Sequence, residues 1–334
     1  MSLVKTYPRV WSLENGIAMV VTDLHGDWDA YERYRNHFTR LHTNGLVDYL
    51  IFTGDLIHAE DPENDASLEI LLDVLALRAS YGDCIIYICG NHELPHIYAI
   101  SLSRGDRAYT PEFEKVLSHS RWRKQVIDLF SSLPFYIRSR AGVSVTHAGA
   151  PAVITEPDNV IKLFAWDHQA VLNWAELQLK QGNIVALRRG FSNLHHGLPY
   201  DTLAKYFLDV AGPQDPRYDD LLRGFFASNH PDFNPLLWST LFTRCEEEYG
   251  LSDHGIFVEA LLQELSVDFV PQRFLVTGHM TIKGGHQAVT PQHLRLASAR
   301  HASPRTAGEY LLFDTSQPVN SIKELSKGLG SVFK

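Results

Sequence analysis

Five segments of this chain share one pattern, in which a short apolar run is followed within a few residues by a glycine and by aspartate, histidine or asparagine. The first covers residues 16–21 and leads into Asp23, His25 and Gly26. An apolar run of this length predicts a buried strand. Ionisable groups directly after a buried strand indicate a loop with a chemical role. A single Asp-x-His motif is weak evidence for a functional loop, because a surface turn can have the same sequence. The recurrence of the pattern after four further apolar runs is what constrains the fold.

The pattern returns after the apolar runs at 47–52, 84–89, 142–146 and 273–277. Helical periodicity over 28–42 and 66–80 separates the first three runs. Alternating strands and helices predict a parallel sheet with right-handed crossovers, and in such sheets ligands bind beyond the carboxyl ends of the strands. The side chains placed at that edge are, in chain order, Asp23, His25, Asp55, Asn91, His92, His147 and His279.

The chain between the apolar runs predicts further structure, most of it helical and between the fourth run and the last. Residues 95–109 read as irregular surface chain and 121–133 as a helix, whereas helical patterns dominate 151–270. We expect a catalytic domain formed by residues 1–150 and 271–334, with 151–270 as a mostly helical insertion or cap. Two further strands, 293–297 and 309–313, are expected near the end of the sequence.

Composition narrows the class of protein. Hydrophobic residues make up 45% and charged residues 21% of the 334 residues, which is ordinary for a globular protein. The net charge of −9 and the lack of a basic stretch argue against a nucleic-acid polymer as partner. Three scattered cysteines fit a reducing compartment. No apolar run approaches the ~20 residues of a membrane span. We therefore expect a cytoplasmic protein with no membrane partner.

The ligand types at the predicted sheet edge point to metal ions. Carboxylate, imidazole and amide groups suit divalent Mn, Fe or Zn. Two such ions about 3.5–4 Å apart need a bridging carboxylate, and together they activate a water and clamp a phosphate ester. Asp55 is the candidate bridge because it follows the central strand. His92, next to the ligand Asn91, is expected to point elsewhere and to act as the general acid for the leaving group.

The order Asp-x-His-Gly, Gly-Asp, Gly-Asn-His-Glu, His-Ala-Gly and Gly-His resembles the calcineurin-like metallophosphoesterases. The resemblance is to the serine/threonine phosphoprotein phosphatase branch and its bacterial relatives, including the diadenosine tetraphosphatase type. It implies a four-layer α/β/β/α sandwich with two mixed sheets and a helical insertion, in place of one parallel sheet. Carried over by motif, Asp23, His25 and Asp55 hold the first metal ion. The second ion is held by Asp55, Asn91, His147 and His279, and His92 is the proton donor.

The chain departs from that family at its phosphate-binding positions. The segment after Asp55 lacks the usual arginine and has His58 where an acidic partner is common, and Cys89 stands where an arginine is frequent. Arg244 and His58 are therefore the candidate substrate contacts, although an exposed helix charge is an equal explanation of Arg244. The last motif also lacks the second histidine that many metallophosphoesterases carry. His286 is a candidate replacement, but a surface-loop position is the preferred interpretation.

These features predict a dinuclear-metal phosphoesterase that hydrolyses a phosphomonoester or phosphoprotein through attack of metal-bound hydroxide. Manganese is the expected metal, with iron or zinc as alternatives. A dinucleoside polyphosphate hydrolase is the runner-up, and it would need stacking aromatic residues in the cap. A third possibility is a scaffold that keeps the fold and binds without catalysis, which the complete set of ligands disfavours. The aromatic candidates for nucleotide stacking are Trp166, Trp174, Phe225 and Phe226.

Overall fold

The computed structural model describes residues 2–242 and 245–333, which form two compact units. The first unit contains Met1–Asn91, Leu133–Trp166 and Trp238–Lys334, and the second contains His92–Ser132 and Asp167–Leu237. The second unit thus takes in a segment that the sequence placed in the catalytic domain. The expectation that residues 151–270 are an insertion stays a prediction.

Two mixed sheets form the centre of the first unit. The five-stranded sheet has the order β16-β15-β3-β4-β5, in which β3, β4 and β5 are parallel and β15 is antiparallel to β3. The seven-stranded sheet has the order β1-β2-β8-β9-β10-β13-β12, in which β9, β10 and β13 are parallel. The bounds of the first sheet are β16 (Leu329–Gly330), β15 (Tyr310–Asp314), β3 (Ile17–Val21), β4 (Tyr49–Phe52) and β5 (Ile85–Tyr87). Those of the second are β1 (Ser2–Tyr7), β2 (Val10–Asn15), β8 (Tyr136–Ser139), β9 (Val143–Thr146), β10 (Phe274–Thr277), β13 (His293–Leu296) and β12 (His286–Thr290).

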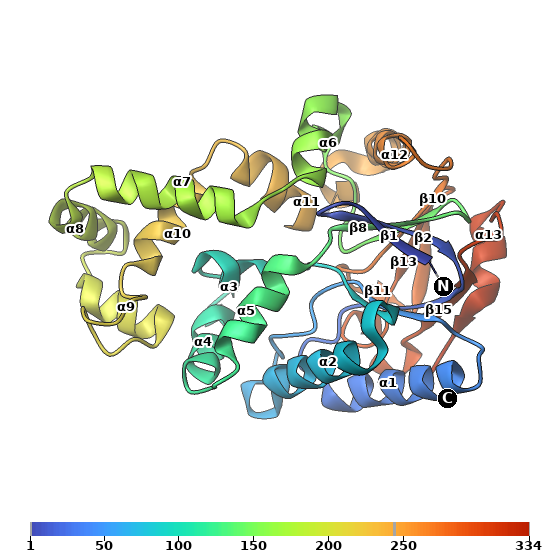
Figure 1. The fold of residues 1–334 in the computed structure, drawn as a ribbon, viewed down its shortest axis with the longest axis horizontal. Helices are drawn as coiled ribbons and strands as arrows, with labels where there is room; N and C mark the ends of the chain where they lie inside the picture. Colours follow the sequence, from blue (N-terminus) through green and yellow to red (C-terminus); the bar gives the residue numbers. More distant parts are fainter. Residues whose placement is uncertain (1, 243–244, 334) are drawn as a thin grey trace. The chain divides into compact units, whose positions relative to one another are not determined.

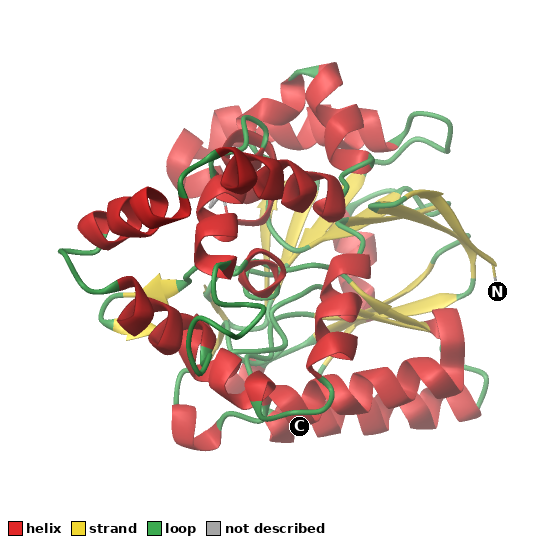
Figure 2. Ribbon diagram, turned by 60° about the vertical axis from the view of Figure 1, so that its left-hand side comes forward, coloured by secondary structure: helices red, strands yellow, loops and turns green. Residues whose placement is uncertain are grey.

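The main hydrophobic core lies between these two sheets. Ala18 and Val20 of β3 belong to the same buried cluster as Val143 and Val145 of β9. These positions alternate along each strand because successive strand residues point to opposite faces. Figure 1 shows α1 (Trp28–Thr43) and α2 (Ser67–Tyr81) on one side of the sheets and α12 (Cys245–Leu265) on the other. Figure 2 shows the same strands between helices. The expected four-layer α/β/β/α sandwich is confirmed, and a single parallel sheet was wrong.

The second unit is mainly helical, with its own core around Tyr200, Leu203 and Leu222. The sequence was wrong to expect irregular surface chain directly after Pro95, because Leu94–Tyr98 is a buried helix. Pro95 is compatible with its first turn, where a backbone N–H has no intrahelical partner. The helices of this unit are α3 (Leu94–Tyr98), α4 (Tyr109–Ser118), α5 (Arg123–Ser132), α7 (His168–Gln181), α8 (Ile184–Leu194), α9 (Tyr200–Leu208) and α10 (Asp220–Ser228).

Several short elements complete the described chain. None of the helices within residues 2–242 and 245–333 is long and apolar enough to cross a membrane. The strands β1 and β2 were not expected from the sequence, because their apolar residues are interrupted by charged and polar ones. The remaining elements are β6 (Ser103–Arg104), β7 (Arg107–Ala108), α6 (Pro157–Phe164), α11 (Ser239–Phe242), β11 (Ile282–Lys283), β14 (Ala302–Ser303) and α13 (Ile322–Leu325).

Candidate metal centre

Polar side chains that follow five strands form two neighbouring groups in the first unit. Parallel strands present their carboxyl ends at one edge of a sheet, and β3, β4 and β5 meet this condition in one sheet as β9, β10 and β13 do in the other. In each group the candidate ligand atoms lie within 4.8 Å of one another. The groups are Asp23 with His25 and His301, and Asp55 with His147 and His279.

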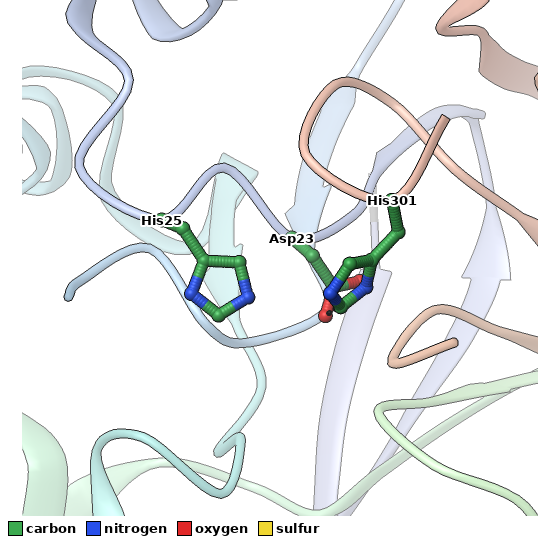
Figure 3. A group of neighbouring side chains, drawn as sticks. All are labelled: Asp23, His25 and His301. Atoms are coloured by element: carbon green, nitrogen blue, oxygen red, sulfur yellow. Dashed lines mark ion pairs between the residues drawn. The ribbon is translucent and has the colours of Figure 1, made fainter. Parts of the chain in front are cut away.

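The first group joins the loop after β3 to the loop after β13. Asp23 Oδ1 lies 3.5 Å from His301 Nδ1, and the rings of His25 and His301 have their centroids 5.2 Å apart. Figure 3 shows the three side chains approaching one another from these two chain segments. The sequence predicted Asp23 and His25 as ligands of one ion but did not identify His301.

The second group is tighter. His147 Nε2 lies 3.1 Å from His279 Nδ1 and 2.8 Å from Asn91 Oδ1. Three side chains from three strand ends therefore direct donor atoms at one small space. The four residues that the sequence assigned to a second ion, Asp55, Asn91, His147 and His279, are brought together.

Asp55 belongs to the second group and also approaches His25 of the first group. Its Oδ2 atom is 3.7 Å from His25 Nε2 and 3.6 Å from His147 Nε2. Both distances exceed those of a good hydrogen bond, and both end on the same carboxylate oxygen. This is the placement expected of a carboxylate that bridges two ions.

Backbone carbonyls orient two of the histidines. The Nδ1 atom of His25 lies 3.1 Å from the carbonyl oxygen of Ile57, and that of His147 lies 2.9 Å from the carbonyl oxygen of Thr53. A neutral imidazole that donates its Nδ1–H to a carbonyl keeps the lone pair of Nε2 for a metal. Both Nε2 atoms face Asp55, so the carbonyls hold the rings in a ligand-ready tautomer.

Burial favours the neutral form of these histidines. Burial, with the charge of Arg300 as the second cause, lowers the pKa of His25 to about 3. Burial and the neighbouring His279 lower the pKa of His147 well below 6.5. The pKa of His301 is also well below 6.5, first because of burial and then because of His25. Neutral imidazole is the form that binds metal ions.

The backbone is shaped for close approach at this site. A Cβ on Gly278 would lie 2.0 Å from Asp23 Oδ2, and the same oxygen accepts a hydrogen bond from the backbone N–H of His279. His25, Asp55 and His279 have φ angles of 45°, 52° and 68°. Such left-handed conformations cost energy in residues with a side chain, and they concentrate at functional sites.

The donor set fits divalent metal ions. Carboxylate, amide oxygen and neutral imidazole nitrogen are the ligands of Mn²⁺, Fe²⁺ and Zn²⁺. The 3.1 Å approach of His147 Nε2 to His279 Nδ1 directs two imidazoles at a common point, which a shared cation makes favourable.

The remaining residues that the sequence singled out are His92, His58, Arg244 and His286. His92 belongs to the second unit, where its ring centroid is 5.2 Å from that of Tyr109. His58 is buried and its backbone N–H donates to Ser67. Arg244 lies outside the described residues. His286 is in β12, where its Nδ1 is 2.6 Å from Glu309 Oε2.

His301 was missed although a signal was present. It follows the buried run of β13 by a few residues, which is the same rule that identified the other ligands. No glycine adjoins it, and the intervening Ser298-Ala299-Arg300 reads as part of the strand's exit. A search for every histidine after a buried strand would have included it.

The chain matches the sequence model of one protein family. The sequence model of the calcineurin-like phosphoesterase family matches residues 18–280. No curated protein matches the chain at a significant level.

Solved structures similar to the chain include phosphatases. One is a protein serine/threonine phosphatase from Saccharomyces cerevisiae with similarity to human phosphatase PP5, at 16% identity over 92% of this chain and 76% of that chain, with a TM-score of 0.48. Another is a cold-active protein tyrosine phosphatase, at 15% identity over 91% and 75% of the two chains, with a TM-score of 0.40. A third is a metallophosphoesterase from Sphaerobacter thermophilus, at 12% identity over 94% and 92%, with a TM-score of 0.35.

Proposed function

This chain belongs to the calcineurin-like phosphoesterase family, a family of hydrolases that act on phosphoric esters, and we propose that it uses two metal ions to hydrolyse a phosphomonoester or a phosphoprotein. The observation that carries the proposal is the position of Asp55 Oδ2, which faces His25 on one side and His147 on the other. A bridging carboxylate between two ligand groups is what a dinuclear centre requires.

The chain's own residues prepare the site for this chemistry. The carbonyls of Ile57 and Thr53 keep the Nε2 lone pairs of His25 and His147 directed inward. When bound, two divalent ions supply an activated water and neutralise charge on the phosphate. Manganese is the proposed metal, and the same donor set accepts iron or zinc.

His92 is proposed to protonate the leaving oxygen. It directly follows the ligand Asn91 in the chain, and an alkoxide leaving group needs a proton from a positioned acid. This role rests on the motif and stays a prediction.

A positive charge for the substrate phosphate is proposed to come from Arg300. Arg300 directly precedes His301 in the chain, and after burial its positive charge contributes to the lowered pKa of His25 and of His301. Arg300 also forms an ion pair with Glu60, with 2.5 Å between Arg300 Nη2 and Glu60 Oε2. A substrate phosphate would have to compete with Glu60 for the guanidinium. His58 and Arg244 remain further candidates for substrate contacts.

A cytoplasmic location also stays a prediction.

The proposal is tested with purified protein and an aryl phosphate ester. The metal-stripped protein is assayed with and without added Mn²⁺, beside Asp55→Asn and His92→Asn. We expect activity only with metal, its loss in Asp55→Asn, and a loss in His92→Asn that shrinks when the leaving group is more acidic and needs no proton. Equal activity with and without metal would contradict the proposal.

A panel of phosphopeptides and dinucleoside polyphosphates then identifies the substrate class. Preference for a phosphopeptide or small monoester supports the proposal. Preference for a dinucleoside polyphosphate would replace it by the nucleotide hydrolase, and tight binding of two metals without turnover of any ester would favour a binding scaffold.

A further inference from the structure

We propose that His301 is a direct ligand of the first metal ion, and that it supplies the imidazole that the last motif lacks. The inference rests on the proposed dinuclear site and assigns one more residue to it. The sequence after His279 reads Met280-Thr281, so no second histidine follows there.

The position of His301 supports a ligand role. Its side chain is 13% exposed, and its Nδ1 atom is buried without a hydrogen-bond partner among the described residues. This atom lies 3.5 Å from Asp23 Oδ1. Such a separation is longer than a good hydrogen bond, whereas two ligands of one ion commonly keep about this distance, since each lies about 2 Å from the metal.

The chain topology brings His301 to this place from a different strand. It follows β13, which pairs in parallel with β10, and β10 leads to His279. The loops after these two strands therefore leave the same edge of the seven-stranded sheet. A histidine in the loop after β13 can therefore lie beside the first group, although the motif at Gly278-His279 has no second histidine.

The donor sets of the two ions become similar with His301 included. The first ion would have Asp23, His25, His301 and the shared Asp55. The second would have Asn91, His147, His279 and the shared Asp55. Each set then contains two imidazoles and two oxygen donors, a combination suited to borderline metals. Without His301 the first ion would have one imidazole.

A competing explanation is that His301 only orients Asp23 through a hydrogen bond. A ligand binds metal directly, whereas an orienting residue changes affinity without contact. The two roles are separated by a spectroscopic readout of the bound atom.

In the first experiment, metal-free protein is titrated with Co²⁺, and binding is measured by calorimetry and by visible absorption. We expect two ions per wild-type chain. In His301→Ala we expect one ion to bind as in the wild type and the other at least about tenfold more weakly, since even outer partners of a ligand contribute this much. His286→Ala is the matched control, because His286 is an exposed histidine paired with Glu309. Wild-type affinity for both ions in His301→Ala would overturn the proposal.

The second experiment uses His301→Cys loaded with Co²⁺. A thiolate bound to cobalt gives a sulfur-to-metal charge-transfer band, which the cobalt-loaded wild type provides as baseline. Appearance of the band supports direct ligation by residue 301. Absence of the band from a folded, cobalt-loaded His301→Cys protein overturns the proposal. This second test does not depend on whether His301→Ala folds. Neither readout uses catalysis, so a protein inactive on every ester would contradict the proposed function and leave this inference standing.

Discussion

The Nε2 atom of His147 lies 3.1 Å from the Nδ1 atom of His279, although 132 residues separate the two histidines in the chain. The register of β9 and β10 sets this distance, because Val145 is the partner of Val276 and the backbone N–H of Gly278 donates to the carbonyl of His147. The sheet therefore fixes the spacing of two ligands before any ion binds, and changes that preserve the sheet but disturb its edge should affect the metal centre selectively.

Gly278→Ala is predicted to weaken metal binding. The added Cβ would lie 2.0 Å from Asp23 Oδ2 and 2.9 Å from Thr22 Cβ, so Asp23 must shift. We expect a loss on the order of tenfold or more in metal affinity, comparable to the loss of an outer partner of a ligand. Calorimetric titration of the metal-free protein with Mn²⁺ measures it.

The matched control is Gly190→Ala in α8. A Cβ there meets nothing within 4 Å, and alanine is favoured over glycine inside a helix. Metal affinity should be unchanged in the control. Equal affinities in the two variants would show that Asp23 tolerates the added methyl group.

Arg300→Gln is predicted to weaken substrate binding. Removing a positive charge beside the first ligand group should raise KM for a phosphomonoester about tenfold and lower kcat less, because a phosphate carries its charge in the ground state as well. Arg33→Gln, which removes an exposed arginine paired with Asp29, is the control. Steady-state kinetics at fixed ionic strength measures both, and an unchanged KM in Arg300→Gln would argue against a phosphate contact.

Glu114→Gln is predicted to destabilise the second unit strongly. Glu114 is buried, with His96 and Arg123 each 2.8 Å from its carboxylate. Burial alone would raise the pKa of this carboxyl, but the hydrogen bond and charge of His96 and the charge of Arg123 lower it overall. Removing one partner of a buried ion pair costs about 3–5 kcal/mol.

The neighbouring substitution Glu112→Gln provides the control on the same helix, α4. Glu112 forms an exposed pair with Arg107, and such pairs contribute about 0–1 kcal/mol. Urea unfolding of the wild type and both variants, monitored by circular dichroism, gives the free energy of unfolding of each protein. A similar cost for the two glutamates would contradict the assigned role of Glu114.

His293→Gln is predicted to reduce the acid sensitivity of folding. His293 is buried between His254 and Thr277, at 3.0 Å and 2.8 Å. Burial, and then the neighbouring His254, lowers the pKa of His293 from 6.5 to about 3. The unfolded chain therefore takes up this proton first as the pH falls below 6.5, and stability decreases towards about pH 3.

The measurement compares urea unfolding of metal-free wild type and His293→Gln at several pH values. The wild type is expected to be more stable near pH 7, because the substitution leaves His254 or Thr277 without a good partner. That advantage should shrink by up to about 1.4 kcal/mol per pH unit below pH 6.5. An advantage that stays constant with pH would show that His293 is not held neutral.

The sequence predicted those parts of the structure that depend on local pattern. Runs of apolar residues located β3, β4 and β5, and the polar residues after them pointed to Asp23 and Asp55 as neighbours in space. Local sequence pattern does not determine which loops come to lie beside one another when strands far apart in the chain pair. His301 follows a buried strand, which is a local signal, but the local sequence does not show that β13 pairs with β10, and this pairing is what brings His301 to the first group. The buried helix Leu94–Tyr98 was missed because Pro95 was taken as a sign of irregular chain, although proline is tolerated in the first turn of a helix.

Asp23 accepts a hydrogen bond from the backbone N–H of His279 across 256 residues, and β3 pairs with β15 near the other end of the sequence. A nascent polypeptide therefore carries Asp23 and His25 out of the ribosome long before the residues that complete their surroundings are translated. We therefore expect both candidate ligand groups to be complete only after nearly the whole chain has been translated. A chain terminated just before β10 would keep two of the three residues of each ligand group and would lack His279 and His301.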